Sequence, residues 1–148
     1  MIYSKVHTTR KTGNYVRYFL KIVLLAVIVA SCQKLDTATD DERDNITGAW
    51  SCSENSQQFG SQSFNVEISK SPTDSTRILI DNFYGLGAGY FVYSKMVNLN
   101  LTIPSQTVNG NQITGSGTIS SNYKTINWTY TVIGGGTTDH VTAVYTKK

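Results

Sequence analysis

The stretch that decides the fold is Thr125-Ile126-Asn127-Trp128-Thr129-Tyr130-Thr131-Val132-Ile133, in which large apolar residues alternate with Asn and Thr. A period of two residues is typical of a β-strand with one buried and one solvated face. The triplet Gly134-Gly135-Gly136 follows, and a second alternating stretch covers residues 138–146. Because a glycine run favours chain reversal, we predict an antiparallel pair of strands here.

The same alternation continues outward through residues 46–148, and no stretch there shows a sustained 3.6-residue pattern. Asn109-Gly110 suits a tight hairpin, and Ser71-Pro72-Thr73-Asp74 marks another reversal. The predicted strands are 48–56, 62–70, 76–82, 89–94, 97–103, 112–120, 125–133 and 138–146.

Eight short strands joined by short turns predict an all-β domain over residues 46–148. We expect an up-and-down antiparallel meander that is closed, or nearly closed, as a small barrel, with a two-sheet sandwich as the alternative. Gly115 and Gly117 share one strand face, where glycine weakens the strand unless something needs the space. Such space would be needed at a sharply bent corner of a barrel, or by a tryptophan that packs opposite, Trp50 or Trp128. This favours closure, and we expect both tryptophans inside.

A basic segment and then a short apolar run precede Cys32. Residues 22–30 are uniformly apolar; as a helix they would span about 14 Å, too short for a bilayer core of about 30 Å. The following Val29-Ala30-Ser31-Cys32 resembles the lipobox of bacterial lipoproteins. The resemblance implies a signal peptide at 1–31, cleavage between Ser31 and Cys32, and acyl chains such as palmitate on Cys32 that anchor the protein in a membrane.

Removal of this leader changes the charge of the protein. The whole chain carries +3, but five of its thirteen Lys and Arg residues precede Cys32 and all ten acidic residues follow it. The predicted mature chain therefore has eight basic and ten acidic residues, a net charge of −2. No basic stripe remains, and we expect no nucleic-acid partner.

Residues 32–45 are predicted to be a disordered tether after the lipidated cysteine. They hold one large apolar residue, Leu35, among mostly acidic charges, so they bury too little apolar surface to offset the entropy of ordering. Acidic residues after such a cysteine also resemble the surface-export signal of Bacteroidetes-type lipoproteins. We therefore expect a lipid-anchored cell-envelope protein of the outer membrane, on the cell surface or on the periplasmic face.

Gly48-Ala49-Trp50 resembles the Gly-x-Trp motif of lipocalins, in which the tryptophan plugs the closed end of an eight-stranded barrel. The late-strand arginine that covers this tryptophan in lipocalins is absent, and only Lys147 and Lys148 lie there. The wider domain resembles small Bacteroidetes lipoproteins with lipocalin-like or calycin-like barrels. The segments that carry this second resemblance are Asn82-Phe83-Tyr84-Gly85-Leu86-Gly87, Ile103-Pro104-Ser105-Gln106 and Gly115-Ser116-Gly117-Thr118-Ile119.

The residue types limit the chemistry. His140 is the only histidine after Cys32, so a histidine-based zinc site is excluded and a triad would depend on one strand-end residue that we expect to be exposed. Cys52 shares strand parity with Trp50 and is predicted to be a small buried side chain. Among the carboxylates, Glu54 and Asp81 are the one pair that we do not dismiss as the two carboxyl groups of a glycosidase-type site. We expect no metal, no cofactor and no catalysis.

The aromatic residues around the glycine-rich loop at 83–89 are the feature that favours binding. Tyr84, Tyr90 and Tyr93 are the candidate ligand-binding residues, because exposed rings can stack on sugars or apolar molecules. The alternative is that they pack at the barrel rim, with Phe83 and Leu86 turned inward.

Together these features predict a noncatalytic lipoprotein whose barrel binds an apolar or glycan ligand, or a protein partner. A structural or accessory surface protein with a filled core is the alternative, and a hydrolase or hydrolase inhibitor is a third hypothesis.

Overall fold

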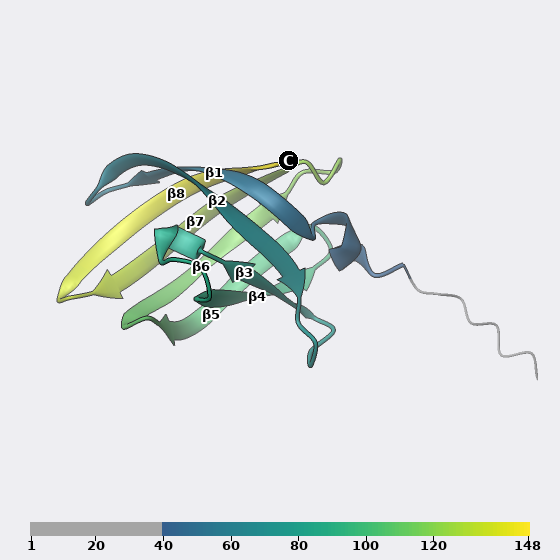
Figure 1. The fold of residues 1–148 in the computed structure, drawn as a ribbon, viewed down its shortest axis with the longest axis horizontal. Coiled ribbons are helices and arrows are strands. Elements are labelled where there is room, and N and C mark those ends of the chain that lie inside the picture. The colour runs from purple at the N-terminus through teal and green to yellow at the C-terminus, as the bar shows by residue number, and fades with distance from the viewer. Residues whose placement is uncertain (1–39) are drawn as a thin grey trace, which may run out of the picture. The chain divides into compact units, whose positions relative to one another are not determined.

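The computed structural model describes residues 40–148, which form the barrel drawn in Figure 1. The predicted signal peptide at 1–31, the lipidation site at Cys32 and the first part of the predicted tether lie outside the described residues. Within the described part of the chain, no helix is long and apolar enough to cross a membrane.

Eight antiparallel strands follow one another around a closed barrel, and β8 pairs with β1 to complete it. This confirms the predicted all-β meander and its closure, and it decides against the sandwich. Two short 3-10 helices accompany the strands, η1 before β1 and η2 after β3. The elements are η1 (Glu42–Asn45), β1 (Gly48–Ser56), β2 (Gly60–Lys70), β3 (Arg77–Asp81), η2 (Phe83–Gly85), β4 (Phe91–Val97), β5 (Asn100–Val108), β6 (Asn111–Ile119), β7 (Thr125–Gly134) and β8 (Thr137–Lys147).

The predicted bounds of two strands, 89–94 and 97–103, are wrong. The alternation over 97–103 runs through a turn, because Asn98 has a left-handed φ of 52° and reverses the chain between β4 and β5. Val97 therefore ends β4 instead of beginning the next strand. β5 then continues past Pro104 to Val108, with a shift of register between Ile103 and Gln106.

The two ends of the barrel differ, and we name them for what lies there. The η1 end carries η1 and the loops at 71–76, 98–99 and 120–124; the mouth carries the loops at 57–59, 82–90, 109–110 and 135–136.

Folded structure begins before Ile46, the predicted start of the domain. The Asp41 side chain accepts a hydrogen bond from the Arg43 backbone and caps η1. The buried Arg43 guanidinium donates to the carbonyls of Asp74 and Arg77 at 3.1 and 2.9 Å. It also pairs with Asp41 at 2.7 Å. Part of the predicted tether is thus held against the β2–β3 loop.

Inside the barrel, Trp50 and Trp128 are both buried, as predicted. The Trp50 indole lies at the η1 end and donates to the Ile46 carbonyl at 2.9 Å. Gly117 leaves room for Trp128, since a Cβ at this position would lie 2.6 Å from the indole Cε3. The predicted need for space at this glycine is therefore confirmed.

The barrel interior becomes more polar from the η1 end toward the mouth. The inward residues of β1 are, in that order, Trp50, Cys52, Glu54 and Ser56. On β8 the buried residue nearest the mouth is Asp139. The apolar core therefore lies below a buried polar layer, which faces the mouth.

The wall between β4 and β5 is completed by a side chain. The two strands pair only where 95–97 face 100–102. Nearer the mouth, the Gln106 carboxamide donates to the Tyr93 carbonyl at 2.7 Å and accepts from the Tyr93 N–H at 3.0 Å. It takes the place of a backbone peptide group in the barrel wall.

Candidate ligand site at the mouth of the barrel

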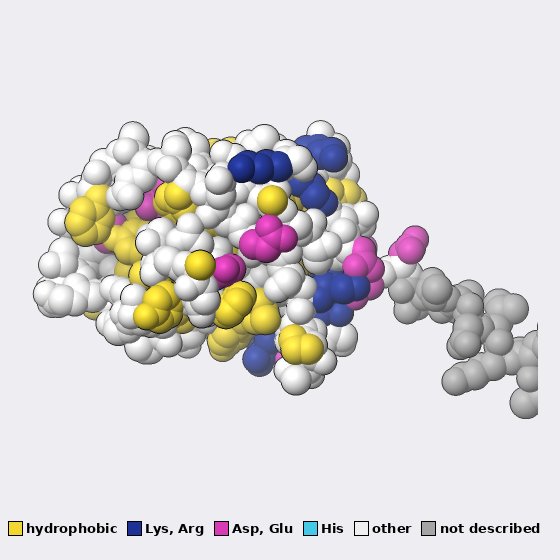
Figure 2. Space-filling model, viewed as in Figure 1, with side chains coloured by type: hydrophobic (Ala, Val, Ile, Leu, Met, Phe, Trp, Pro, Cys, Tyr) yellow, Lys and Arg dark blue, Asp and Glu magenta, His cyan; other side chains and the backbone are white. Residues whose placement is uncertain are grey.

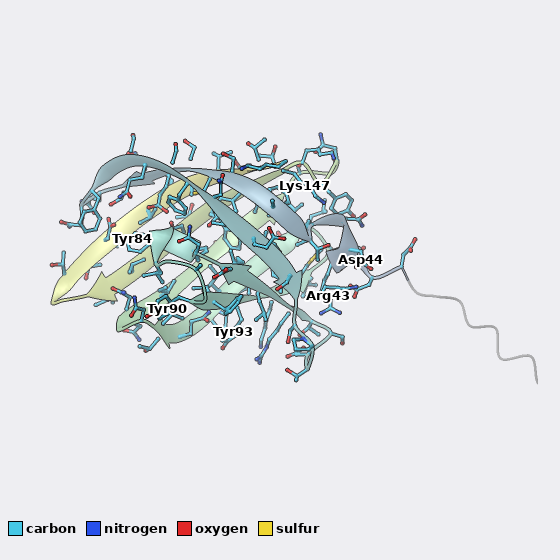
Figure 3. All side chains as sticks on the ribbon, in the orientation of Figure 1. Arg43, Asp44, Tyr84, Tyr90, Tyr93 and Lys147 are labelled. Atoms are coloured by element: carbon cyan, nitrogen blue, oxygen red, sulfur yellow. The ribbon has the colours of Figure 1, made fainter. Side chains whose placement is uncertain are left out.

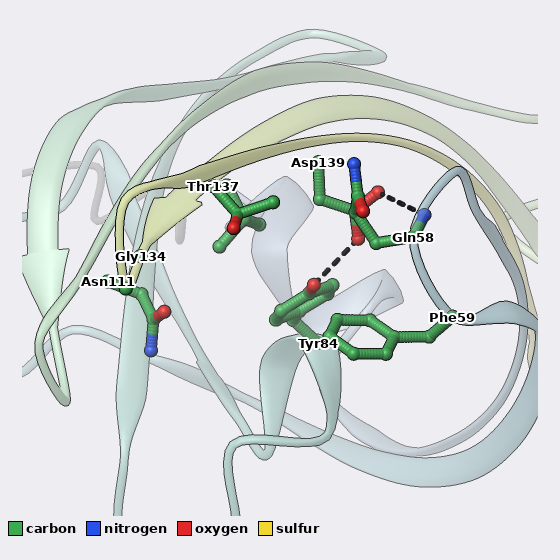
Figure 4. A pocket seen from close by; sticks show the side chains of 9 residues that line it. Gln58, Phe59, Tyr84, Asn111, Gly134, Thr137 and Asp139 are labelled. Carbon is green, nitrogen blue, oxygen red and sulfur yellow. Dashed lines mark hydrogen bonds between the residues drawn. The ribbon is translucent and has the colours of Figure 1, made fainter.

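A cavity of about 340 Å³ lies at the mouth (Figure 4). It is lined from three of the four mouth loops and the strand ends beside them. The lining residues are Gln58, Phe59, Tyr84, Asn111, Val132, Gly134, Gly135, Thr137 and Asp139.

The Asp139 carboxylate is the polar centre of this cavity, although the residue is only 3 % exposed. Its Oδ2 accepts hydrogen bonds from the hydroxyl groups of Ser56 and Tyr84, both at 2.6 Å. Its Oδ1 accepts from the Gln58 backbone N–H at 3.1 Å. Figure 4 shows the carboxylate between Tyr84 and Gln58.

These bonds determine the charge state of Asp139. Burial alone would raise the pKa of its carboxyl group. The hydrogen bonds from Ser56, Tyr84 and the backbone of the β1–β2 loop outweigh burial and hold the pKa below its usual range. Asp139 is therefore ionised at neutral pH.

Tyr84 reaches Asp139 from an unusual backbone conformation. Its φ and ψ are 59° and 20°, within η2, and the preceding Asn82 also has a left-handed φ of 59°. For a bulky residue this conformation costs about 1–3 kcal/mol, and it persists only where the surroundings fix it. Strained residues of this kind are concentrated at functional sites.

Three contacts fix the Tyr84 ring. The hydroxyl group donates to Asp139, the ring meets Tyr130 edge-on at 6.1 Å between centroids, and Phe59 lies tilted at 6.5 Å. The pKa of the Tyr84 phenol is raised by burial and then by the negative charge of Asp139. The phenol is therefore a hydrogen-bond donor at neutral pH.

A second carboxyl group, Glu54, lies deeper in the barrel and does not line the cavity. It accepts a hydrogen bond from the Tyr130 hydroxyl group through Oε2, while Oε1 has no partner among the described residues. Burial raises the pKa of Glu54, the Tyr130 bond opposes this, and the charge of Asp139 adds to the increase.

The predicted pairing of Glu54 with Asp81 is wrong. Ile78 and Ile80 are buried, so their neighbour Asp81 lies on the outer face of β3. There it accepts hydrogen bonds from the backbone N–H groups of Asn82 and Gly89. The carboxyl group that lies near Glu54 is Asp139.

Of the three predicted ligand-binding residues, the structure places only Tyr84 at the cavity (Figure 3). Tyr90 is 43 % exposed in the loop before β4 and does not line the cavity. Tyr93 lies on the outer face of β4, where the Arg77 guanidinium stacks 4.5 Å from its ring centroid. Phe83, next to Tyr84, is fully buried, so the loop also closes the core.

The residues for which the sequence predicts no binding or catalytic role lie away from the cavity or deep in the core. His140 is exposed and its Nδ1 lies 3.2 Å from the Thr131 hydroxyl group. Cys52 is a buried free thiol, and burial raises its pKa to about 12. Among the described residues, no group of three His, Cys, Asp or Glu side chains is placed to hold a metal.

Two residues of the site were missed from the sequence. Asp139 shares strand parity with Val141 and Ala143, and extending that alternation by one step would have placed it inside. Phe59 belongs to the β1–β2 loop and is 68 % exposed. No period marks a loop residue, so the sequence held no signal for it.

The basic residues are unevenly distributed along the barrel axis. In residues 40–148, every Lys and Arg lies at the η1 end or in the adjoining half of a strand; they are Arg43, Lys70, Arg77, Lys95, Lys124, Lys147 and Lys148. On the face in Figure 2, dark blue is confined to the half next to η1, whereas magenta and yellow are visible within the hollow of the other half. Within residues 40–148, the mouth thus has an anionic centre and no Lys or Arg beside it.

No protein-family model matches the chain, and no curated protein matches it either.

Proposed function

We propose that this protein is a noncatalytic, lipid-anchored envelope lipoprotein that binds a small ligand at the mouth of its barrel. The observation that carries the proposal is the mouth cavity, where Phe59, Tyr84 and Asp139 meet from separate parts of the chain. Apolar walls with a few fixed polar groups are the usual composition of a small-molecule site.

The cavity also bears on the alternative of a structural protein with a filled core. The core below the polar layer is filled, with Phe83, Trp128 and Tyr130 packed ring against ring. Above this filled core, the cavity at the mouth leaves room for a ligand. A volume of about 340 Å³ suits a small molecule, since such sites begin at roughly 300 Å³.

The point at which the described chain enters the barrel is compatible with binding at the mouth. The chain enters the barrel through η1, and the mouth loops lie at the opposite end. A lipid on Cys32 would therefore be attached through the end that carries no cavity residue. Anchoring and ligand binding would not compete for the same surface.

A hydrolase is the second candidate, and one observation favours it. The pKa of Glu54 is raised and the pKa of Asp139 is lowered, and such a divergence is typical of acid–base pairs. Against it, Glu54 is 2 % exposed and does not line the cavity. A general acid must come within hydrogen-bond reach of the bond that it cleaves, so we place binding first.

The proposal is tested by an NMR fragment screen on the purified protein. We expect hits to shift the backbone amides of 58–59 and 135–137. Thr137→Trp, which fills the mouth, should abolish these shifts. Thr146→Trp, an equally exposed position on β8 away from the mouth, should preserve them. Hits that bind equally to both variants, or a screen with no hit at the mouth, would contradict the proposal.

A further inference from the structure

We infer that the mouth recognises the ammonium group of a small organic cation, through the Asp139 carboxylate and the rings of Phe59 and Tyr84. This inference rests on the proposed function: it takes the mouth cavity as a binding site and assigns the chemical class of its ligand.

The Asp139 carboxylate has capacity for one more donor. An ionised carboxylate offers about four lone-pair positions. Two on Oδ2 are used by Ser56 and Tyr84, and one on Oδ1 is used by the Gln58 N–H. The Gln57 N–H also helps to lower the pKa of Asp139, but it donates to the His140 carbonyl at 3.1 Å. The remaining position belongs to a residue that lines the cavity. An ammonium group there would form a charge-assisted hydrogen bond, roughly twice as strong as a neutral one.

The charge of Asp139 is not compensated from within the described chain. None of the ion pairs in residues 40–148 includes it. The Lys and Arg residues lie toward the other end of the barrel, and His140 is on the outer face. Hydrogen bonds stabilise this buried carboxylate, but they do not neutralise its charge. A neutral hydroxyl group of a ligand could donate a hydrogen bond, but an ammonium group also neutralises the charge.

The aromatic wall supplies the second half of the recognition. Phe59 exposes 68 % of its surface although it is a large apolar residue, and it leans against Tyr84. A cation over an aromatic face gains about 0.5–2 kcal/mol, more where water is excluded. Two rings beside a carboxylate therefore suit an ammonium group attached to a compact apolar body. The cavity has room for one such molecule.

The experiment compares three probes that share one ring and differ in charge: benzylammonium, benzyl alcohol and benzoate. Each is titrated into the isotopically labelled protein and followed by the amides of 58–59 and 135–137. We expect benzylammonium to bind at least about tenfold more tightly than benzyl alcohol, and benzoate to leave these amides unshifted. Added salt should weaken benzylammonium binding, because the interaction is ionic.

Variants locate the charge that is responsible. Asp139→Asn should weaken benzylammonium binding by about tenfold or more and leave benzyl alcohol binding little changed. Glu67→Gln removes an exposed carboxylate on the outer face of β2 and should change neither affinity. If Asp139→Asn does not fold, Phe59→Ala serves instead, since its ring is exposed. It should weaken benzylammonium binding several-fold without loss of the folded spectrum.

Two results would overturn the inference. In the first, benzyl alcohol binds as tightly as benzylammonium; the cation preference is then wrong, while the proposed binding function stands because the mouth amides still shift. In the second, benzylammonium shifts only amides near the acidic residues of η1, so that its charge is recognised elsewhere. The proposed function is judged separately, by the fragment screen and the Thr137→Trp variant.

Discussion

The Lys147 ammonium group lies over the Trp50 indole, 5.8 Å from the ring centroid, and donates a hydrogen bond to the Asn45 carbonyl at 2.6 Å. Lysine thus covers the tryptophan where lipocalins, which the sequence resembles, use an arginine. One side chain thus links the last strand with Trp50 and η1.

Lys147→Ala should lower the free energy of unfolding by about 1 kcal/mol, from the loss of one cation–π contact and one hydrogen bond. Urea denaturation measures this change. Lys148→Ala is the matched control, because the Lys148 side chain is exposed and such substitutions usually stay within about 0.5 kcal/mol. Equal effects of the two variants would contradict the assigned contact.

Gly117→Ala should destabilise the barrel by about 1–3 kcal/mol, because the new methyl group would overlap the Trp128 ring in a packed core. The red edge of tryptophan fluorescence and the denaturation midpoint report the change together. Thr118→Ala, on the solvated face of β6, is the control and should be nearly neutral. A neutral Gly117→Ala would mean that the indole can move aside.

Tyr84→Phe should cost about 1–2 kcal/mol, since it removes a hydrogen bond to an ionised carboxylate from a half-buried ring. It should also raise the pKa of Asp139, because one of the bonds that lower this pKa is lost. Carbon-13 NMR of the Asp139 carboxyl group measures this shift. Tyr90→Phe, in an exposed position, should leave the carboxyl titration unchanged.

Glu54→Gln should become increasingly stabilising, relative to the native protein, as the pH rises. The folded pKa of Glu54 is raised above its ordinary value of 4.5, first by burial, so the folded state holds this proton more tightly than the unfolded state. The native protein therefore loses stability as the pH rises from about 4.5 through the folded pKa of Glu54. Glutamine cannot ionise and escapes this loss.

Urea denaturation of Glu54→Gln and the native protein between pH 3 and pH 8 checks the sign. Ser51→Ala, on the outer face of β1, is the control, because it removes no ionisable group, and its difference in stability from the native protein should not depend on pH. Tyr130 and Asp139 are the two residues whose interactions shift the pKa of Glu54, and both are present in Glu54→Gln and in the native protein. A pH-independent difference for Glu54→Gln would show that this carboxyl group ionises as it does in the unfolded chain.

Cys32→Ala should abolish membrane association if the lipobox interpretation is correct, because the acyl chains are the anchor that the sequence predicts. Fractionation of cells, followed by extraction of the membranes with and without detergent, measures this. Ser51→Ala, on the outer face of β1, is a control that should leave the membrane fraction unchanged. A Cys32→Ala protein that still needs detergent for its release would contradict the interpretation.

The sequence predicted the barrel better than the site, for a physical reason. Strand parity follows from a period of two, so the burial of Trp50, Cys52 and Trp128 could be predicted from their neighbours. The site depends on loops. Tyr84 points at Asp139 because its backbone is left-handed, and no hydrophobic period predicts that conformation.

The mistaken carboxylate pair has a different cause, because both residues in question lie on strands. The predicted pairing of Glu54 with Asp81 does not follow strand parity. Ile78 and Ile80 face the interior, so Asp81, next to Ile80, faces outward. Asp139 was not predicted to lie inside, although alternate residues of β8 point to opposite faces. Consistent use of parity would have found Asp139, but not the loop residue Phe59.

The Gln106 carboxamide between β4 and β5 gives the barrel a seam. The longest strand pairs, such as β1 with β2 and β7 with β8, are joined by ladders of backbone hydrogen bonds, which any sequence can form. Near the mouth this seam is joined by one side chain bound to Tyr93. The strands of the barrel are therefore not held together equally strongly all the way around. Local opening of the barrel should therefore begin between β4 and β5 near the mouth. We expect the Tyr93 backbone amide to exchange with solvent deuterium sooner than the paired amides of β7 and β8.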